Sequence, residues 1–328
     1  DQTLVFGAIT TLAKEVPTAV ITDPDQTISS VKANIEITDE DGVIEAGTLS
    51  AVLTKDGVVV GSPVALVVGD NFNVEFTGIM SDSNYVINIY VDYDLDDSKG
   101  IIEDVRLGDI QIRTDIKELP EGTIQNVTSG IESISFDVII TDPDNVITAG
   151  TTKAVLYIGD TPTVYEILLN VGLNTGVTFN NIYSDQDFNI RILTDYDLDD
   201  GVTSVVGEML TYDFADTGIN QMVTGSIYSV TEGIDSITFS AAVTDPDSVV
   251  TGNLKALLLL NNIPTGDEIA VVVGDNINLQ FTGLISDSEY TIRLVTDYSK
   301  RDLTGEITDQ YLDSYTTNTD DYSAPSGY

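Results

Sequence analysis

The chain contains no cysteine, no histidine and no tryptophan. Without cysteine and histidine it lacks the thiolate nucleophile, the usual zinc and haem ligands, and the commonest general base near neutral pH. Positive charge is also scarce, because 13 lysines and arginines face 54 aspartates and glutamates, for a formal net charge of -41. Such a surface repels nucleic-acid phosphates and anionic lipid headgroups and attracts cations. Much of enzyme chemistry is excluded, and no nucleic-acid partner is expected.

Long hydrophobic runs are missing as well. The longest apolar stretches, such as Ala256 to Leu260 and Ile269 to Val273, have the length of a strand. A membrane-spanning helix needs about 20 apolar residues, so no membrane insertion is expected. A hydrophobic content of 42% in 328 residues is enough for two or three domains, each with its own core. The chain begins at Asp1 and has no signal peptide, so we expect a processed protein or part of a longer one.

What the sequence does contain is a threefold repeat. An offset of 103 residues aligns Thr38-Asp39-Glu40-Asp41 with Thr141-Asp142-Pro143-Asp144, and the same shift reaches Thr244-Asp245-Pro246-Asp247. Matches such as Phe76 with Phe179 are spread over the whole period, so whole domains are duplicated rather than one loop. We predict repeat 1 at 16–118, repeat 2 at 119–220 and repeat 3 at 221–317.

The two ends of the chain lie outside these repeats. Lys14-Glu15-Val16-Pro17 aligns with Lys117-Glu118-Leu119-Pro120, so residues 1–15 are interpreted as the last strand of a preceding repeat. We therefore expect a longer array, or a strand that completes a sandwich with another chain. The segment from Thr316 has the polar, Ser- and Gly-containing composition of a flexible end, and we assign 318–328 to a tail.

Each repeat has the pattern of short strands, without helical periodicity. In repeat 2, Ile134, Phe136, Val138 and Ile140 alternate with other residues and are followed by an Asp-Pro-Asp turn. The further strand candidates are 123–127, 153–158, 165–170, 176–180, 188–195 and 208–214. About seven strands per 100 residues, separated by Gly, Asn and Asp, predict an all-β fold of three tandem seven-stranded immunoglobulin-like sandwiches.

A short motif refines this prediction. The segment from Leu284 to Leu294, with Ser286, Ser288 and Tyr290 at fixed spacing, resembles the fibronectin type III signature that carries the tyrosine corner. Repeat 1 has Tyr85 at the same place, but repeat 2 has Phe188, and serine stands where the family usually has proline. The chain resembles divergent fibronectin type III-like or bacterial immunoglobulin-like repeats of bacterial surface and phage virion proteins. That resemblance implies display, spacing and adhesion.

Acidic loops form the candidate site. In such sandwiches the loop after the second strand and the loop after the sixth emerge at the same end, so their carboxylates should converge. Ca²⁺ takes six to eight oxygen ligands, and a hard cation would relieve the repulsion. The candidate ligands are Asp39, Asp41, Asp94, Asp96 and Asp97 in repeat 1, and Asp142, Asp144, Asp197, Asp199 and Asp200 in repeat 2. The alternative, equally weighted, is that these aspartates only form solvated turns.

Repeat 3 distinguishes the two interpretations. There Ser299-Lys300-Arg301-Asp302 replaces the acidic segment, and its cations could neutralise Asp245 and Asp247 directly. We therefore predict Ca²⁺, if bound, in repeats 1 and 2 but not in repeat 3. The acidic surface has a simpler explanation too, since charge keeps arrays of β domains soluble and prevents edge pairing.

No catalytic residue is predicted. Asp216-Thr217-Gly218 matches the aspartic protease triplet, but that chemistry needs two such carboxylates and the triplet occurs once, in a linker. Tyr93, Tyr196 and Tyr298 recur beside the acidic loop, where we favour closure of the core over ligand contact.

We expect a non-enzymatic, extracellular structural protein, part of a virion appendage or a bacterial surface stalk. Its partners would be other copies or neighbouring structural proteins. The alternatives are an adhesin that binds a glycan or protein receptor, and accessory modules of a larger secreted hydrolase.

Overall fold

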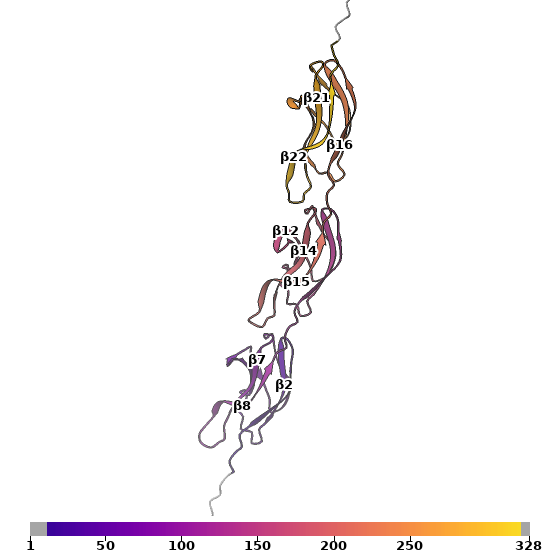
Figure 1. The fold of residues 1–328 in the computed structure, drawn as a ribbon. Coiled ribbons are helices and arrows are strands. Elements are labelled where there is room, and N and C mark those ends of the chain that lie inside the picture. The colour runs from indigo at the N-terminus through magenta and orange to yellow at the C-terminus, as the bar shows by residue number, and fades with distance from the viewer. Residues whose placement is uncertain (1–11, 323–328) are drawn as a thin grey trace, which may run out of the picture. The chain divides into compact units, whose positions relative to one another are not determined.

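The computed structural model describes residues 12–322, and all regular structure in that range is β-strand (Figure 1). No helix in these residues has the length and apolarity needed to cross a bilayer. Repeat 1 contains β1 (Thr18–Gln26), β2 (Ser30–Thr38), β3 (Ser50–Lys55), β4 (Val58–Val59), β5 (Val64–Ala65), β6 (Gly69–Thr77), β7 (Asn84–Tyr93) and β8 (Ile102–Arg113).

Repeats 2 and 3 follow the same plan with seven strands each. Repeat 2 contains β9 (Glu121–Ser129), β10 (Ser133–Thr141), β11 (Lys153–Ile158), β12 (Thr161–Leu168), β13 (Gly172–Asn180), β14 (Asp187–Asp197) and β15 (Ser204–Asp216). Repeat 3 contains β16 (Thr224–Glu232), β17 (Ser236–Thr244), β18 (Val250–Leu260), β19 (Ile263–Ala270), β20 (Gly274–Thr282), β21 (Glu289–Ser299) and β22 (Glu306–Asn318).

The strands of each repeat form a three-stranded and a larger sheet. In repeat 1 the sheets have the orders β1-β2-β6 and β4-β3-β7-β8, with β5 also paired to β3. The orders β13-β10-β9 and β12-β11-β14-β15 recur in repeat 2, and β16-β17-β20 and β19-β18-β21-β22 in repeat 3. This sheet order is that of an immunoglobulin-like or fibronectin III-like sandwich, so the predicted all-β sandwich fold is confirmed.

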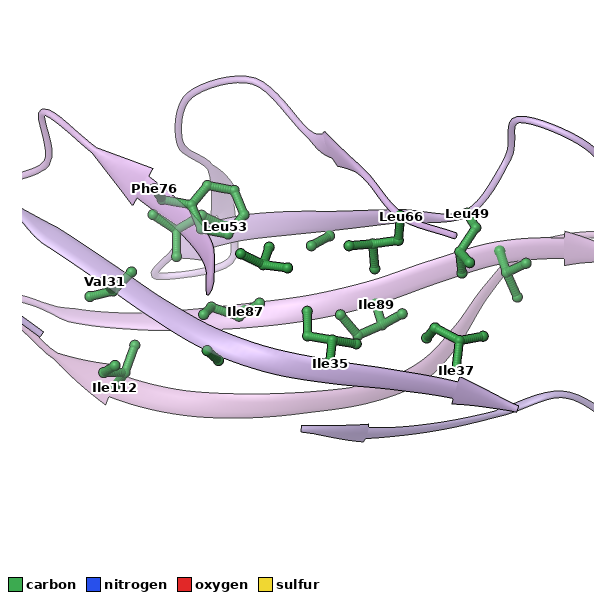
Figure 2. Close-up of a cluster of buried hydrophobic side chains, with 14 of the residues drawn as sticks. Val31, Ile35, Ile37, Leu49, Leu53, Leu66, Phe76, Ile87, Ile89 and Ile112 are labelled. Atoms are coloured by element: carbon green, nitrogen blue, oxygen red, sulfur yellow. The ribbon is translucent and has the colours of Figure 1, made fainter. Parts of the chain in front are cut away.

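The core of repeat 1 follows from strict alternation along its central strands. Val31, Ala33, Ile35 and Ile37 of β2 are buried, whereas the residues between them are partly or fully exposed. Because successive side chains of a strand point to opposite faces, one face of β2 becomes apolar. Figure 2 shows Ile35 and Ile37 in the same cluster as Ile87 and Ile89 of β7, which belongs to the other sheet. Repeat 3 has an equivalent core around Phe239 and Phe281, whose rings stack 5.7 Å apart.

By spatial contacts the chain divides into two compact units. Among the described residues, unit 1 comprises 12–121, 140–152 and 193–210, and unit 2 comprises 122–139, 153–192 and 211–322. The division passes through repeat 2, so the three-domain boundaries predicted above stay a prediction. The strand expected within residues 1–15 falls largely on residues 1–11, outside the described part, and residues 12–15 belong to no strand. At the other end, β22 continues to Asn318, so the strand includes Thr316 and Thr317.

Candidate functional site

The two acidic loops of a repeat meet at one end, which we call the acidic pole: 39–47 with 94–100 in repeat 1, and 142–150 with 197–203 in repeat 2. The Asp94 N–H donates to the Val43 carbonyl at 2.9 Å, and Ile44 forms a bridge with Tyr93. The Asp197 N–H makes the same 2.9 Å bond to Val146. Backbone pairing therefore joins the two loops in both repeats.

The first aspartate of each pole closes its own loop. Asp39 Oδ1 accepts from the Val43 N–H at 2.9 Å, and Asp39 Oδ2 accepts from the Ile44 N–H at 3.2 Å. Asp142 and Asp245 bind the backbone four and five residues ahead in the same way. These bonds are those of turn-forming aspartates.

The second aspartate holds the incoming chain. Asp41 Oδ2 accepts from the Glu15 N–H at 2.7 Å, and Asp144 Oδ2 accepts from the Glu118 N–H at 2.6 Å. In repeat 3 the Gln221 N–H donates to Asp247 at 2.6 Å. We call this contact the linker clamp, because it ties the segment that leads into the first strand of each repeat to that repeat's own loop.

The carboxylates of the second loop also have partners within the chain. Asp94 and Asp197 accept from the N–H groups of Asp96 and Asp199, both at 2.8 Å. The Lys99 ammonium, 2.7 Å from Asp97, lowers the pKa of that carboxyl.

Asp200 caps the turn that follows it in repeat 2. It accepts from the N–H groups of Thr203 and Val202, which lower its pKa in that order of effect, and from the Thr203 hydroxyl.

Two lysines outside the predicted ligand set lie at the acidic poles, one in each repeat. The Lys14 ammonium is 2.5 Å from Asp96, and its pKa is raised by that hydrogen bond and by the negative charges of Asp96, Asp41 and Asp94. Lys117 occupies the equivalent place 3.5 Å from Asp199. Their alignment in the linker was visible in the sequence, but their contact with the loops was not. Within residues 12–322 no three acidic side chains are grouped so that they could hold a metal ion.

Repeat 3 replaces this arrangement with another. Arg301 pairs with Glu132 at 2.5 Å, so it does not neutralise Asp245 and Asp247 as expected from sequence. Asn220, at the position of Lys117, donates to the Lys300 carbonyl at 2.6 Å and to Glu132 at 2.8 Å.

Within each unit, a buried serine binds the second loop of the following repeat. In unit 1 the Ser81 N–H donates to the Asp199 carbonyl at 3.1 Å, and its hydroxyl donates to the Leu198 carbonyl. In unit 2 the Ser184 N–H donates to Arg301 at 3.0 Å, and its hydroxyl donates to Lys300. These are the serines that replace the family's proline, so the departure from the motif has a structural role.

The protease-like triplet serves the fold. The hydroxyl of Thr217, which is buried, donates to the Tyr183 carbonyl at 2.9 Å and accepts from the Gln186 N–H at 3.0 Å. Thr114 and Thr319 make the same pair of bonds in repeats 1 and 3. The three recurring tyrosines, Tyr93, Tyr196 and Tyr298, are buried in the core, as favoured from the sequence.

The sequence matches no protein-family model and no curated protein. Among solved structures, the chain is similar to domains A168–A170 of titin, with 8% identity and a TM-score of 0.28. It is also similar to the FN1–FN3 domains of chicken CNTN1, with 9% identity and a TM-score of 0.24. Each comparison covers 93% of this chain and 100% of the other. The fold class itself rests on the sheet order.

Proposed function

We propose that the chain is a non-enzymatic structural and display protein, built of tandem β-sandwich modules in an extracellular appendage. A phage virion appendage or decoration and a bacterial surface stalk are the two settings that fit its composition. Its partners would be further copies or neighbouring structural proteins. Ca²⁺ bound at the acidic poles of repeats 1 and 2 would stiffen the array.

The linker clamp is the observation that carries this proposal. The same backbone N–H, that of Glu15, Glu118 or Gln221, binds the same loop aspartate before all three repeats. Hydrogen bonds to a charged group are stronger than neutral ones and are directional. A repeated clamp fixes the direction in which the chain enters each module, which a spacer requires and an isolated globular domain does not.

The serine contacts add a second restraint of the same kind. Ser81 and Ser184 are almost fully buried, and each binds two successive carbonyls of a loop more than 100 residues away. Together with the clamp, they restrict bending between consecutive modules.

Small-angle X-ray scattering of the full chain tests the proposal. A compact globule of 328 residues has a radius of gyration of about 20 Å, so modules held in series should give a clearly larger value. The double variant Ser81→Ala and Ser184→Ala should broaden the distance distribution, whereas Ser62→Ala, an exposed site, should leave it unchanged. A radius near that of the compact globule would refute the spacer role.

An adhesin is the second candidate. A cleft in unit 2 that is lined by two tyrosines and an arginine favours it.

A further inference from the structure

Unit 2 contains a cleft of about 430 Å³. Its lining includes Tyr165, Asn181 and Tyr183 from repeat 2, and Ser299, Arg301 and Leu303 from repeat 3. Small-molecule sites have volumes of roughly 300–1,000 Å³ and combine apolar or aromatic walls with a few polar groups. The cleft has both the size and the lining of such a site.

Its aromatic wall is a fixed pair. The rings of Tyr165 and Tyr183 lie 5.9 Å apart, edge to face, and the Tyr165 hydroxyl donates to the Asn181 carbonyl at 3.3 Å. Partial burial raises the pKa of Tyr165 most, and the nearby Tyr183 and Glu132 raise it further. The phenol therefore stays protonated at neutral pH, and its oxygen can still accept a hydrogen bond from a ligand.

Charge decides which ligands suit the cleft. Arg301 is already paired with Glu132, so its charge is neutralised, while the guanidinium has five N–H donors, more than one ion-pair bond engages. The net charge of -41 opposes an anionic ligand. Lys300, next to Arg301 in the sequence, opposes a cationic one. A neutral ligand that is rich in hydrogen-bonding groups remains.

Unit 1 has different residues at the equivalent positions. Met80 stands at the position of Tyr183, and its sulfur is 3.2 Å from where a side-chain carbon on Gly201 would lie. In repeat 3, Leu303 stands at the position of Gly201 and lines the cleft. Unit 2 thus has a tyrosine and a leucine where unit 1 has a flexible methionine, Met80, and a glycine, Gly201. These two residues give the cleft a larger aromatic and aliphatic lining.

We propose that this cleft binds a neutral saccharide of one or two hexose units. A hexose has an apolar C–H face that can pack on a tyrosine ring, and hydroxyls that match the donors and acceptors of Arg301, Asn181 and Ser299. The site does not depend on the display role, because its ligand contacts are separate from the linker clamp.

Saturation-transfer NMR of the full chain tests this site, with millimolar methyl glycosides of glucose, galactose, mannose and N-acetylglucosamine as probes. We expect transfer to at least one of them. Tyr183→Ala should weaken binding at least tenfold, since it removes half of the aromatic wall. Tyr322→Ala, which alters an exposed tyrosine elsewhere, is the matched control and should bind as the wild type does.

Thermal melting of each variant shows that it is folded. If Tyr183→Ala has a much lower melting temperature than the wild type, Leu303→Ser, at an exposed position, provides the second test. This variant should weaken binding at least threefold. No transfer to any of the four glycosides would overturn the proposal. Unchanged binding in folded Tyr183→Ala would also overturn it. So would binding of N-acetylneuraminate, an anionic sugar tested beside the four glycosides, without binding of any neutral one.

Discussion

The hydroxyl of Tyr290 accepts a hydrogen bond of 3.0 Å from the backbone N–H of Ile285, five residues earlier. Tyr85 makes the same 3.0 Å bond with Met80 in repeat 1. Both tyrosine rings are buried, whereas repeat 2 has the buried Phe188 at this position and no hydroxyl to form the bond. The tyrosine corner inferred from the sequence motif is therefore present where the hydroxyl exists.

Replacing Tyr290 with phenylalanine should lower the free energy of unfolding of repeat 3 by about 1 kcal/mol, the usual net value of one hydrogen bond. Urea unfolding followed by tyrosine fluorescence would measure it. Tyr315→Phe, at a half-exposed position on β22, should change it by less than about 0.5 kcal/mol. Equal effects of the two substitutions would contradict a stabilising role for the corner.

The fold could be predicted because the core strands alternate strictly. In repeat 2 the expected strand 153–158 coincides with β11, and all seven expected strands exist. The predicted strand ends were less accurate. β12 begins at Thr161 instead of Tyr165, and β13 begins at Gly172 instead of Gly176. No residue of β12 and only Phe179 of β13 is fully buried, so a run of core residues does not mark the ends of these strands. The short turn before Thr161 and the backbone pairing with β11 set the start of β12 instead.

The candidate site was predictable only in part. The convergence of the loops follows from the order of strands, and pairing of Asp94 with Val43 bears it out. The sequence could not show that Lys14 and Lys117 reach the loops, since each ion pair joins residues 82 positions apart. Nor could the sequence show that Arg301 pairs with Glu132, because the two residues are 169 positions apart in the chain.

Gly225 of β16 lies where any side chain would collide with the core. A carbon added there would be 2.6 Å from Leu294 Cδ2 and 3.2 Å from Leu312 Cδ1. Gly225→Ala should therefore destabilise repeat 3 by about 1–3 kcal/mol, as overpacking does. Differential scanning calorimetry should show one transition shifted to lower temperature.

Gly108 of β8 is the matched control for this prediction. The nearest atom to a carbon added there is the Ala19 carbonyl oxygen at 3.7 Å, an ordinary contact. Gly108→Ala should be neutral or stabilising by up to about 1 kcal/mol, because it restricts the unfolded chain. A loss of stability at Gly108 as large as at Gly225 would rule out the steric explanation.

Asp297 makes stability in repeat 3 depend on pH. The Asp309 N–H donates to its Oδ1 at 2.8 Å, and the Asn253 N–H donates to its Oδ2 at 3.1 Å. These two bonds, in that order, lower its pKa. A carboxylate with a lowered pKa in the folded state contributes stability that is present above its ordinary pKa of about 4 and is lost as the pH falls through the lowered value.

Asp297→Asn should therefore lower the melting temperature by about 2–4 °C at pH 6–7, and the difference should shrink below about pH 4. Thermal melting followed by circular dichroism between pH 2.5 and 7 would measure it. Asp275→Asn, at an exposed position in β20, should show no such trend. A difference that is constant or grows toward acid pH would exclude this role for Asp297.

Calcium binding at the acidic poles of repeats 1 and 2 is still a prediction, and Lys14 sharpens its test. The ammonium lies beside Asp96 and in the field of Asp41 and Asp94, where a cation would bind. Lys14→Gln removes this competing charge. If the pole binds Ca²⁺, isothermal titration calorimetry should show at least threefold tighter binding in this variant than in the wild type.

Substituting the loop carboxylates in the same experiment distinguishes a specifically bound cation from general screening of the negative charge. Asp94→Asn with Asp197→Asn should weaken calcium binding, whereas Asp302→Asn in repeat 3 should not. At a calcium concentration 100 times the dissociation constant, binding stabilises the wild type by about 2.7 kcal/mol, which a chelator should reverse. Screening alone would act equally in all variants and would be reproduced by sodium chloride at matched ionic strength. No calcium heat, together with melting temperatures unaffected by chelator, would leave the poles as turns held by their own backbone and by Lys14 and Lys117.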